Sequence, residues 1–402
     1  MSAPFAGIKV VDFSWVGVGP ITARYLGDFG ATVVRVESAT RPETLRLTPP
    51  FAGEQPGLNR SGYFANYNCN KLGVTINLKH QQGPTLARRL AAWADVAIES
   101  FTPGTMADLG LSYQELAQAN PGLIMLSTCN QGQTGPRASQ PGFGTQLVSQ
   151  AGFTWLTGWP DRTPTQPYAA YTDLIAPKLG AAAVAAALDY RRRSGRGQHL
   201  DLSQLEAGIQ FLAPQVLDYT VNGRVAMRQG NRDENWAPHG AYRCQGQDSF
   251  IALAVTCGQE WQALVRTVGE PWCDDARFQD APGRLQHQDD LDRLLEGWTS
   301  HWRAAELMAR LQQAGVPAGV VLSPEEIHSD PQLAHRGHFW HLQHPEIGRH
   351  AYDGPAFRLS RTPGDVRLPA PLLGQHNEQV FVGMLGLSDQ EFVALLASGA
   401  LE

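Results

Sequence analysis

An aspartate at the start of a small-residue helix is the side chain best suited to covalent chemistry. Asp173 follows the segment PYAAYT and opens an alanine- and glycine-rich stretch that predicts a helix over residues 173–193. The helix dipole and free N–H groups favour a carboxylate there, so an ordinary helix cap is one interpretation. The other is a nucleophile, because Tyr168 and Tyr171 would flank its approach and alanines would not shield it. A carboxylate that attacks an acyl group forms an anhydride.

A glycine-containing segment, GVGPIT at residues 17–22, is the second candidate. It follows a predicted strand, opens a predicted helix, and has Glu37 at the end of the next strand. That context suggests a dinucleotide site, but Thr22 replaces the third glycine of the fingerprint, and Pro20 stands where an N–H should face the pyrophosphate. Proline starts helices well, and glycines let a ligand approach the backbone. We expect a ligand to touch this turn; a dinucleotide-dependent oxidoreductase stays an alternative.

Four histidines recur at every third position, at His335, His338, His341 and His344. No cysteine or carboxylate pair accompanies them, so a surface or interface loop is favoured over a metal site, and no metal is predicted. The sequence also contains no G-x-S-x-G elbow, no phosphate-binding G-x-x-x-x-G-K-[ST] loop and no H-E-x-x-H pair. The commonest hydrolase, nucleotide triphosphatase and zinc protease motifs are therefore missing.

Short β-branched runs alternate with helical patterns over the first 130 residues. This alternation predicts an α/β fold with a doubly wound parallel sheet. The expected strands are residues 9–13, 31–37, 74–78, 95–100 and 123–127. The texture changes at about 225–310, where two short antiparallel strands and several helices indicate a second, smaller domain.

Composition limits the class of protein. The 402 residues are 43% hydrophobic and 17% charged, with a formal net charge of −6. Nucleic-acid and anionic-membrane binding need a basic surface, which this balance disfavours. We find no export signal and no long apolar run, and the five cysteines are scattered rather than paired in motifs. A cytoplasmic protein with free thiols is expected.

The order and spacing of several segments resemble the class III CoA-transferases, the group of formyl-CoA transferase, carnitine CoA-transferase and alpha-methylacyl-CoA racemase. The segments include VVDFSWVGVGPITARYLGDFGATVVRVE, NYNCNKLGVTINLK, ADVAIESFTPG, PGFGTQLVSQAGFTWLTG, RRRSGRGQHLDLS and LGQHNEQVF. The resemblance implies that Asp173 attacks an acyl-CoA and passes through an anhydride and an aspartyl-CoA thioester. It implies CoA and acyl-CoA as substrates, with no permanently bound cofactor.

The resemblance also implies a set of residues that lie against CoA, with Lys79 as a phosphate partner. Related enzymes often carry arginines where this chain has Ser38 and Asp108, and Arg41 is the candidate substitute. The implied CoA-contacting residues are Val16, Gly17, Val18, Arg41, Ile76, Asn77, Leu78, Lys79, Ser100, Phe101, Gln140 and Phe143.

The expected reaction is transfer of CoA from an acyl-CoA to an organic acid, with succinyl-CoA as the expected donor. Departures from the family pattern disfavour other reactions. A racemase needs a histidine where this chain has Phe143. The segment RDENWA (232–237) replaces a glycine-rich loop, which disfavours formate or oxalate. Trp155, Trp159 and Tyr168 suggest a larger, more apolar acceptor. The alternatives are an acyl-CoA racemase or epimerase, and a non-catalytic acyl-CoA-binding homologue.

The family further implies an interlocked, ring-like homodimer. Each subunit would have a large doubly wound domain built from residues 1–205 and 316–402. A linker helix at 206–224 would lead to a small α+β domain at 225–315.

Overall fold

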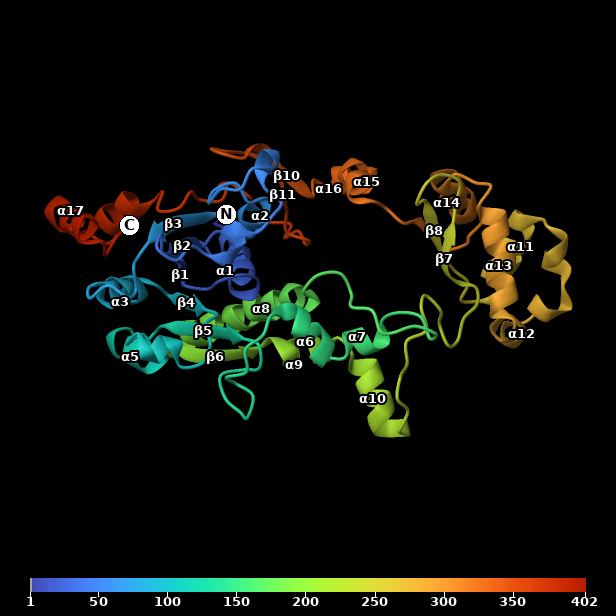
Figure 1. Ribbon diagram of the computed structural model, residues 1–402, viewed down its shortest axis with the longest axis horizontal. Coiled ribbons are helices and arrows are strands. Elements are labelled where there is room, and N and C mark those ends of the chain that lie inside the picture. Colours follow the sequence, from blue (N-terminus) through green and yellow to red (C-terminus); the bar gives the residue numbers. More distant parts are fainter. Residues whose placement is uncertain (1) are drawn as a thin grey trace. The chain divides into compact units, whose positions relative to one another are not determined.

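The computed structural model describes residues 2–402, which form two compact units (Figure 1). Unit 1 comprises residues 2–154, 166–225 and 331–402, so both ends of the chain contribute to it. Unit 2 comprises residues 155–165 and 226–330.

Unit 1 is built on a six-stranded parallel sheet in the order β3-β2-β1-β4-β5-β6. Its strands are β1 (Lys9–Asp12), β2 (Thr32–Glu37), β3 (Lys71–Thr75), β4 (Val96–Glu99), β5 (Ile124–Cys129) and β6 (Gln198–Ser203). In register, Val10 of β1 lies opposite Val33 of β2 and Val96 of β4. Runs rich in valine and isoleucine suit strands that are buried on both faces. The predicted α/β class with a parallel sheet is confirmed.

Alternate residues of each strand face opposite sides of the sheet. Val10 and Val33 share a core with α1 and α8 on one side. Val11 and Val34 share another core with α3, α5 and α17 (Figure 1). The sheet is therefore covered by helices on both faces.

Helix α8 packs closely against α1, which explains its small residues. A side-chain carbon added at Gly180 of α8 would lie 3.0 Å from Thr22 Oγ1 of α1. The helices of unit 1 and its border are α1 (Val18–Asp28), α2 (Gly62–Asn68), α3 (Gly83–Trp93), α4 (Thr105–Asp108), α5 (Tyr113–Ala119), α6 (Gly144–Gln150), α7 (Phe153–Leu156), α8 (Tyr171–Ser194), α9 (Gln204–Gln210), α10 (Ala213–Asn222), α16 (Pro331–Arg336) and α17 (Asp389–Ser398). The remaining elements are the 3-10 turns η1 (Thr44–Leu47) and η2 (Ala52–Glu54), the π-helical turn η5 (Gln379–Met384), and the hairpin of β10 (Phe339–His344) and β11 (Gly348–Asp353).

Unit 2 contains a three-stranded sheet in the order β7-β8-β9, packed with helices around Trp261, Phe278 and Leu295. Its elements are β7 (His239–Arg243), β8 (Phe250–Ala254), α11 (Gly258–Val268), η3 (Pro271–Asp274), η4 (Ala276–Phe278), α12 (Ala281–Gln286), α13 (Gln288–Thr299), α14 (Ala304–Gln313), β9 (Ala318–Val320) and α15 (Pro324–Ser329).

Three details correct the sequence-based expectations. Strand β9 pairs with β8, so the smaller unit continues to residue 330 instead of ending at 315, and it also takes in residues 155–165. The predicted linker at 206–224 belongs to unit 1 as most of α9 and α10. Strand β3 ends at Thr75, three residues before the predicted end, because the chain leaves the sheet at Ile76.

The histidine-rich segment forms part of α16 and strand β10. Among residues 2–402, no three histidine, cysteine or acidic side chains are grouped as a metal site would need. Nor does this part of the chain contain a helix long and apolar enough to cross a bilayer.

Candidate active site

The strand order places a crevice at the point where the sheet reverses its winding. Strands β1 and β4 are neighbours, and the chain leaves them toward opposite sides of the sheet, which opens a ligand-binding crevice at their carboxyl ends. Trp15 follows β1, and Ser100 and Phe101 follow β4. All three residues line a cavity of about 530 Å³. The topology of the sheet therefore sets the position of the site.

Asp173 lies in this cavity, as the third residue of α8. Its Oδ1 is buried and has no hydrogen-bond partner within residues 2–402. Burial raises the pKa of the Asp173 carboxyl from 3.8 to about 7, because water no longer solvates the charged form. Ala170 is the residue at the N-cap position of the helix and makes no side-chain capping bond, whereas Asp173 lies inside the first turn. The cap interpretation of Asp173 is therefore wrong.

Two glycines make room for the Asp173 carboxylate. A side-chain carbon added at Gly17 would lie 2.9 Å from Asp173 Oδ2, and one added at Gly144 would overlap Oδ1. Close approach of the backbone is thus the reason for glycine at both positions. Nearby, α8 packs on α6 and α9 through Ile175 and Ala176, which fixes the first turns of the helix. The carboxylate therefore lies close against the backbone, with no hydrogen-bond partner for Oδ1 in the described part of the chain.

Neither of the two tyrosines expected to flank Asp173 lines the cavity. The Tyr168 side chain is 96% exposed, and Tyr171 packs edge-on against Phe153 with ring centroids 5.3 Å apart. Trp155 and Trp159 belong to unit 2, where Trp155 Nε1 donates to the Ala226 carbonyl at 2.9 Å. The prediction that Tyr168 and Tyr171 flank the approach to the Asp173 carboxylate is therefore wrong.

The structure brings together all but one of the residues that the sequence analysis placed against CoA. Gln140 is the exception, because it is exposed in a turn where its N–H donates to the Arg137 carbonyl. Lining the same cavity as Asp173 are Val16, Gly17, Val18, Arg41, Ile76, Asn77, Leu78, Lys79, Ser100, Phe101 and Phe143. The Asp173 carboxylate therefore shares one cavity with residues that follow strands β1, β3 and β4.

Two exposed cations line the cavity, and they suit an anionic ligand. Lys79 and Arg41 are both exposed, and the Arg41 guanidinium lies 5.1 Å from the centroid of the Trp15 ring. Ser38 also lines the cavity, and its hydroxyl donates to Glu402 at 2.8 Å. Asp108 is exposed and does not line it. Among residues 2–402, Lys79 and Arg41 are therefore the two cationic side chains that line the cavity.

Sequence reasoning missed several cavity residues that directly follow strands. Asn130 follows β5, Gln204 follows β6, and Trp15 comes shortly after β1. Gln204 is 8% exposed, and its Oε1 has no hydrogen-bond partner in the described part of the chain. Position at the carboxyl end of a predicted parallel strand was the signal that could have found these residues.

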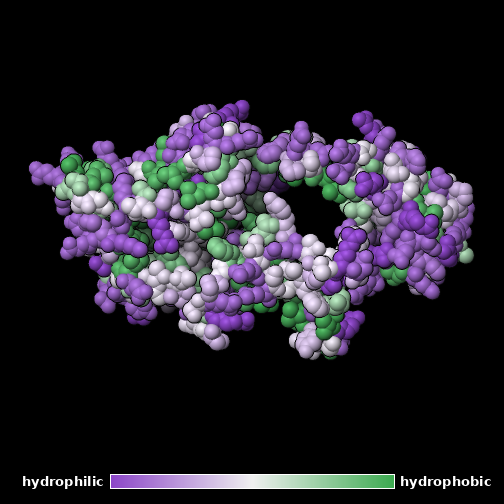
Figure 2. Space-filling model, viewed as in Figure 1, coloured by the Kyte–Doolittle hydropathy of each residue, from purple (hydrophilic) through white to green (hydrophobic). Residues whose placement is uncertain are grey.

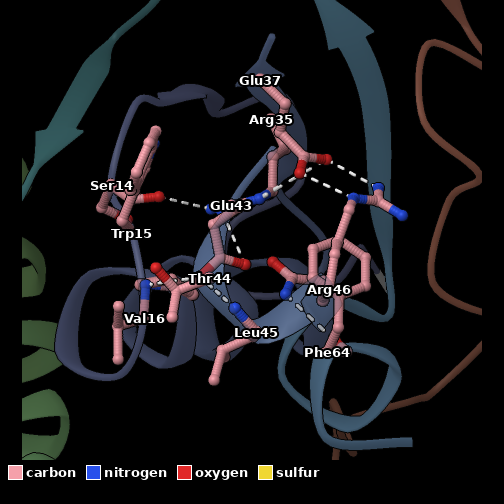
Figure 3. A network of polar contacts seen from close by, with 12 residues as sticks. Ser14, Trp15, Val16, Arg35, Glu37, Glu43, Thr44, Leu45, Arg46 and Phe64 are labelled. Carbon is pink, nitrogen blue, oxygen red and sulfur yellow. Dashed lines mark hydrogen bonds and ion pairs between the residues drawn. The ribbon is translucent and has the colours of Figure 1, made fainter. Parts of the chain in front are cut away.

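Glu37 is committed to a buried ion pair, which argues against a dinucleotide site. Its two carboxylate oxygens each accept from Arg46, both at 2.7 Å (Figure 3). The Glu37 side chain is therefore not free to bind the ribose hydroxyls of NAD, which is the role that the fingerprint requires.

Comparison with known proteins identifies the class of enzyme. The model of CoA-transferase family III matches residues 5–377. The chain belongs to this family and is therefore a transferase that acts on CoA thioesters.

Individual relatives cover almost the whole chain. It is 32% identical to the succinyl-CoA–D-citramalate CoA-transferase of Chloroflexus aurantiacus, over 98% of this chain and 97% of that protein. It is 33% identical to the succinate–glutarate CoA-transferase of Agrobacterium fabrum, over 94% of each chain. Its fold is similar to the crystal structure of a CaiB/BaiF family protein from Brucella suis, with a TM-score of 0.87, 30% identity, and coverage of 95% and 100%.

Proposed function

We propose that this protein transfers CoA from succinyl-CoA to a dicarboxylic acid, with Asp173 as the nucleophile. The observation that carries the proposal is a buried carboxylate oxygen without a partner, in the cavity shared with the expected CoA-contacting residues. Two relatives support the substrate class, because their names give succinyl-CoA or succinate with citramalate or glutarate. Both acceptors are dicarboxylic acids.

The proposed reaction begins with an anhydride. The Asp173 carboxylate attacks the thioester carbonyl of succinyl-CoA, the C–S bond breaks, and CoA leaves as a thiolate. The thiolate then attacks the aspartyl carbonyl of the anhydride, which releases succinate and leaves an aspartyl-CoA thioester. Neither step needs a net proton transfer.

The second half reverses this order with the acceptor. The acceptor carboxylate attacks the aspartyl-CoA thioester and expels CoA thiolate, which gives a new anhydride. Thiolate attacks the acceptor's carbonyl, forms the product acyl-CoA and regenerates the Asp173 carboxylate. Shielding Asp173 from solvent suits this chemistry, because water would hydrolyse both intermediates.

The cavity residues suit the parts of the substrates. Lys79 would bind a CoA phosphate as a point charge, and Arg41 through the N–H donors of its planar guanidinium. The side-chain amides of Asn130 and Gln204 would donate to carbonyl or carboxylate oxygens near Asp173.

Replacement of Asp173 tests the role of its carboxylate. Asp173→Asn should lower turnover by about 10³-fold or more while CoA affinity stays within about threefold, because the lost group reacts rather than binds. Asp189→Asn, which changes an exposed aspartate on the same helix, is the control. A non-catalytic binding protein would bind CoA without turnover, and full turnover by Asp173→Asn would refute the proposed mechanism.

We also propose a cytoplasmic homodimer. Helix α10 has no buried residue, and its apolar side chains gather on one surface (Figure 2). Leu217 is 59% and Val221 75% exposed. An apolar surface of this kind is typical of a protein interface. Light scattering should give twice the monomer mass, and Leu217→Asp should lower it; a monomeric native protein would refute the assembly.

A further inference from the structure

We infer that Glu43 is a positioning residue for the nucleophile: it holds the backbone of residues 14–17 so that Gly17 lies against Asp173. This inference rests on the proposed role of Asp173. Glu43 itself lies behind the cavity wall, fully buried, and does not line the cavity.

Side chains, rather than other backbone groups, hold the first part of this turn. The Ser14 N–H donates to Asp12 Oδ1 at 3.0 Å, and the Ser14 carbonyl accepts from Arg35 Nη1 at 2.6 Å. The Trp15 N–H donates to Ser100 Oγ at 2.8 Å, and that hydroxyl donates back to the Trp15 carbonyl at 3.1 Å. The path of the turn therefore depends on a few named side chains.

Val16 is the strained residue of the turn. Its φ is 64°, in the left-handed region that a β-branched residue rarely adopts. Its N–H donates to Glu43 Oε1 at 2.9 Å. Strain of this kind persists only where the surroundings hold it, and it gathers at functional sites. The hydrogen bond that Glu43 accepts from the Val16 N–H therefore helps to hold this conformation.

Glu43 is in turn fixed from two directions (Figure 3). Its Oε1 also accepts from the Leu45 N–H at 3.1 Å, which caps the short turn η1. Its Oε2 lies 3.4 Å from Arg35 Nη2, and both side chains are fully buried. The same arginine that binds the Ser14 carbonyl therefore anchors the carboxylate that binds Val16.

The consequence reaches Asp173 through the next residue. Gly17 follows Val16 directly, and a side-chain carbon at Gly17 would lie only 2.9 Å from Asp173 Oδ2. Because the fit is this close, a small movement of the turn changes the space and the water access around the nucleophile. A misplacement of about 1 Å near reacting atoms can cost about 100-fold in rate.

Two substitutions of Glu43 test the inference. Glu43→Gln removes the charge, and Glu43→Asp keeps it but shortens the reach to the Val16 N–H. Each should lower kcat by about 10- to 100-fold while KM for succinyl-CoA changes by less than about threefold. The aspartate variant keeps the experiment informative if the glutamine variant does not fold.

A matched control separates positioning from stability. Asp28 is also buried, and its Oδ2 lies 3.4 Å from Arg24 Nε, but it neither lines the cavity nor bonds to the turn. Asp28→Asn should destabilise the fold comparably and leave kcat within about twofold. An equal loss of kcat in Asp28→Asn and Glu43→Gln would overturn the inference.

Rescue by glycine gives the sharpest outcome. Glycine adopts a φ of 64° without strain, so the double variant Glu43→Gln/Val16→Gly should recover at least about tenfold of the lost kcat. A kcat of the double variant no higher than that of Glu43→Gln would refute the role of Val16.

A measurement that does not depend on turnover distinguishes the positioning role of Glu43 from the nucleophilic role of Asp173. The titration of Asp173 can be followed by ¹³C NMR, with Asp173→Asn used to assign the signal. In Glu43→Gln the pKa of Asp173 should fall from about 7 toward 3.8, because water enters the space around the carboxylate. An unchanged midpoint contradicts the positioning role even if Asp173 is not the nucleophile. Retained turnover in Asp173→Asn contradicts the nucleophile alone.

Discussion

Two buried regions of unit 1 differ in whether their charged side chains are paired. Beneath the turn that follows β1, three acids and three bases form a buried ion-pair cluster: Asp12, Glu37, Glu43, Arg35, Arg46 and Lys71. At the start of α8, the Asp173 carboxylate has neither an ion pair nor a bond to Oδ1 among residues 2–402. The paired region supports the site, and the unpaired group is the one left free to react.

Breaking the paired cluster should give the largest effect on stability. Arg46→Met removes both hydrogen bonds to the buried Glu37 carboxylate and leaves it only the longer ion pair with Arg35, so we expect a loss of about 3–5 kcal/mol in the free energy of unfolding. Urea unfolding followed by circular dichroism measures this loss. A loss below about 1 kcal/mol is typical of a solvent-exposed ion pair and would show that the cluster is not buried from water.

Removing the unpaired charge should have the opposite sign. The pKa of Asp173 rises from 3.8 to about 7 on folding, so the stability of the native protein declines as the pH rises between these values. Asp173→Asn should therefore be more stable than the native protein by up to about 4 kcal/mol above about pH 8, and the difference should vanish below about pH 4. Urea unfolding at both pH values checks this, and a destabilised variant at the higher pH would contradict it.

The same raised pKa predicts how the first chemical step depends on pH. Only the ionised carboxylate attacks the thioester, so the rate of anhydride formation should rise about tenfold per pH unit below 7 and level off above it. Rapid-quench experiments with excess enzyme measure this step. A rate that is flat from about pH 5 to 8 would contradict a buried, unpaired nucleophile.

The exposed cations should give the smallest effect. Lys79→Ala should raise KM for succinyl-CoA by about five- to tenfold and leave kcat nearly unchanged, because an exposed charge contributes about 1 kcal/mol. The increase should shrink at high salt. Arg196→Ala, at an exposed arginine that does not line the cavity, is the control. An equal fall in kcat would show that Lys79 acts in the chemical step.

The sequence could predict the sheet because its signal is local. Valine- and isoleucine-rich strands, and the glycine turn after β1, carry their pattern within a few residues. Position after a strand then brings Val16, Ser100 and Lys79 to one cavity, because the ends of parallel strands meet at one edge.

Other parts of the site could not be predicted from nearby residues. Tyr168 precedes Asp173 closely in sequence, yet a turn leaves its side chain in solvent. The role of Glu43 depends on its bond to Val16, which lies 27 residues away in sequence and is brought next to it only by the fold. The extent of unit 2 depends on pairing between β8 and β9, which are more than sixty residues apart.

Trapping the acylated enzyme tests the central claim most directly. The protein would be mixed with succinyl-CoA and hydroxylamine, digested, and mapped by mass spectrometry. The proposed mechanism predicts a hydroxamate on Asp173, absent without succinyl-CoA and absent from Asp173→Asn. Turnover by the native protein with no hydroxamate, or with the hydroxamate on another carboxylate, would contradict it.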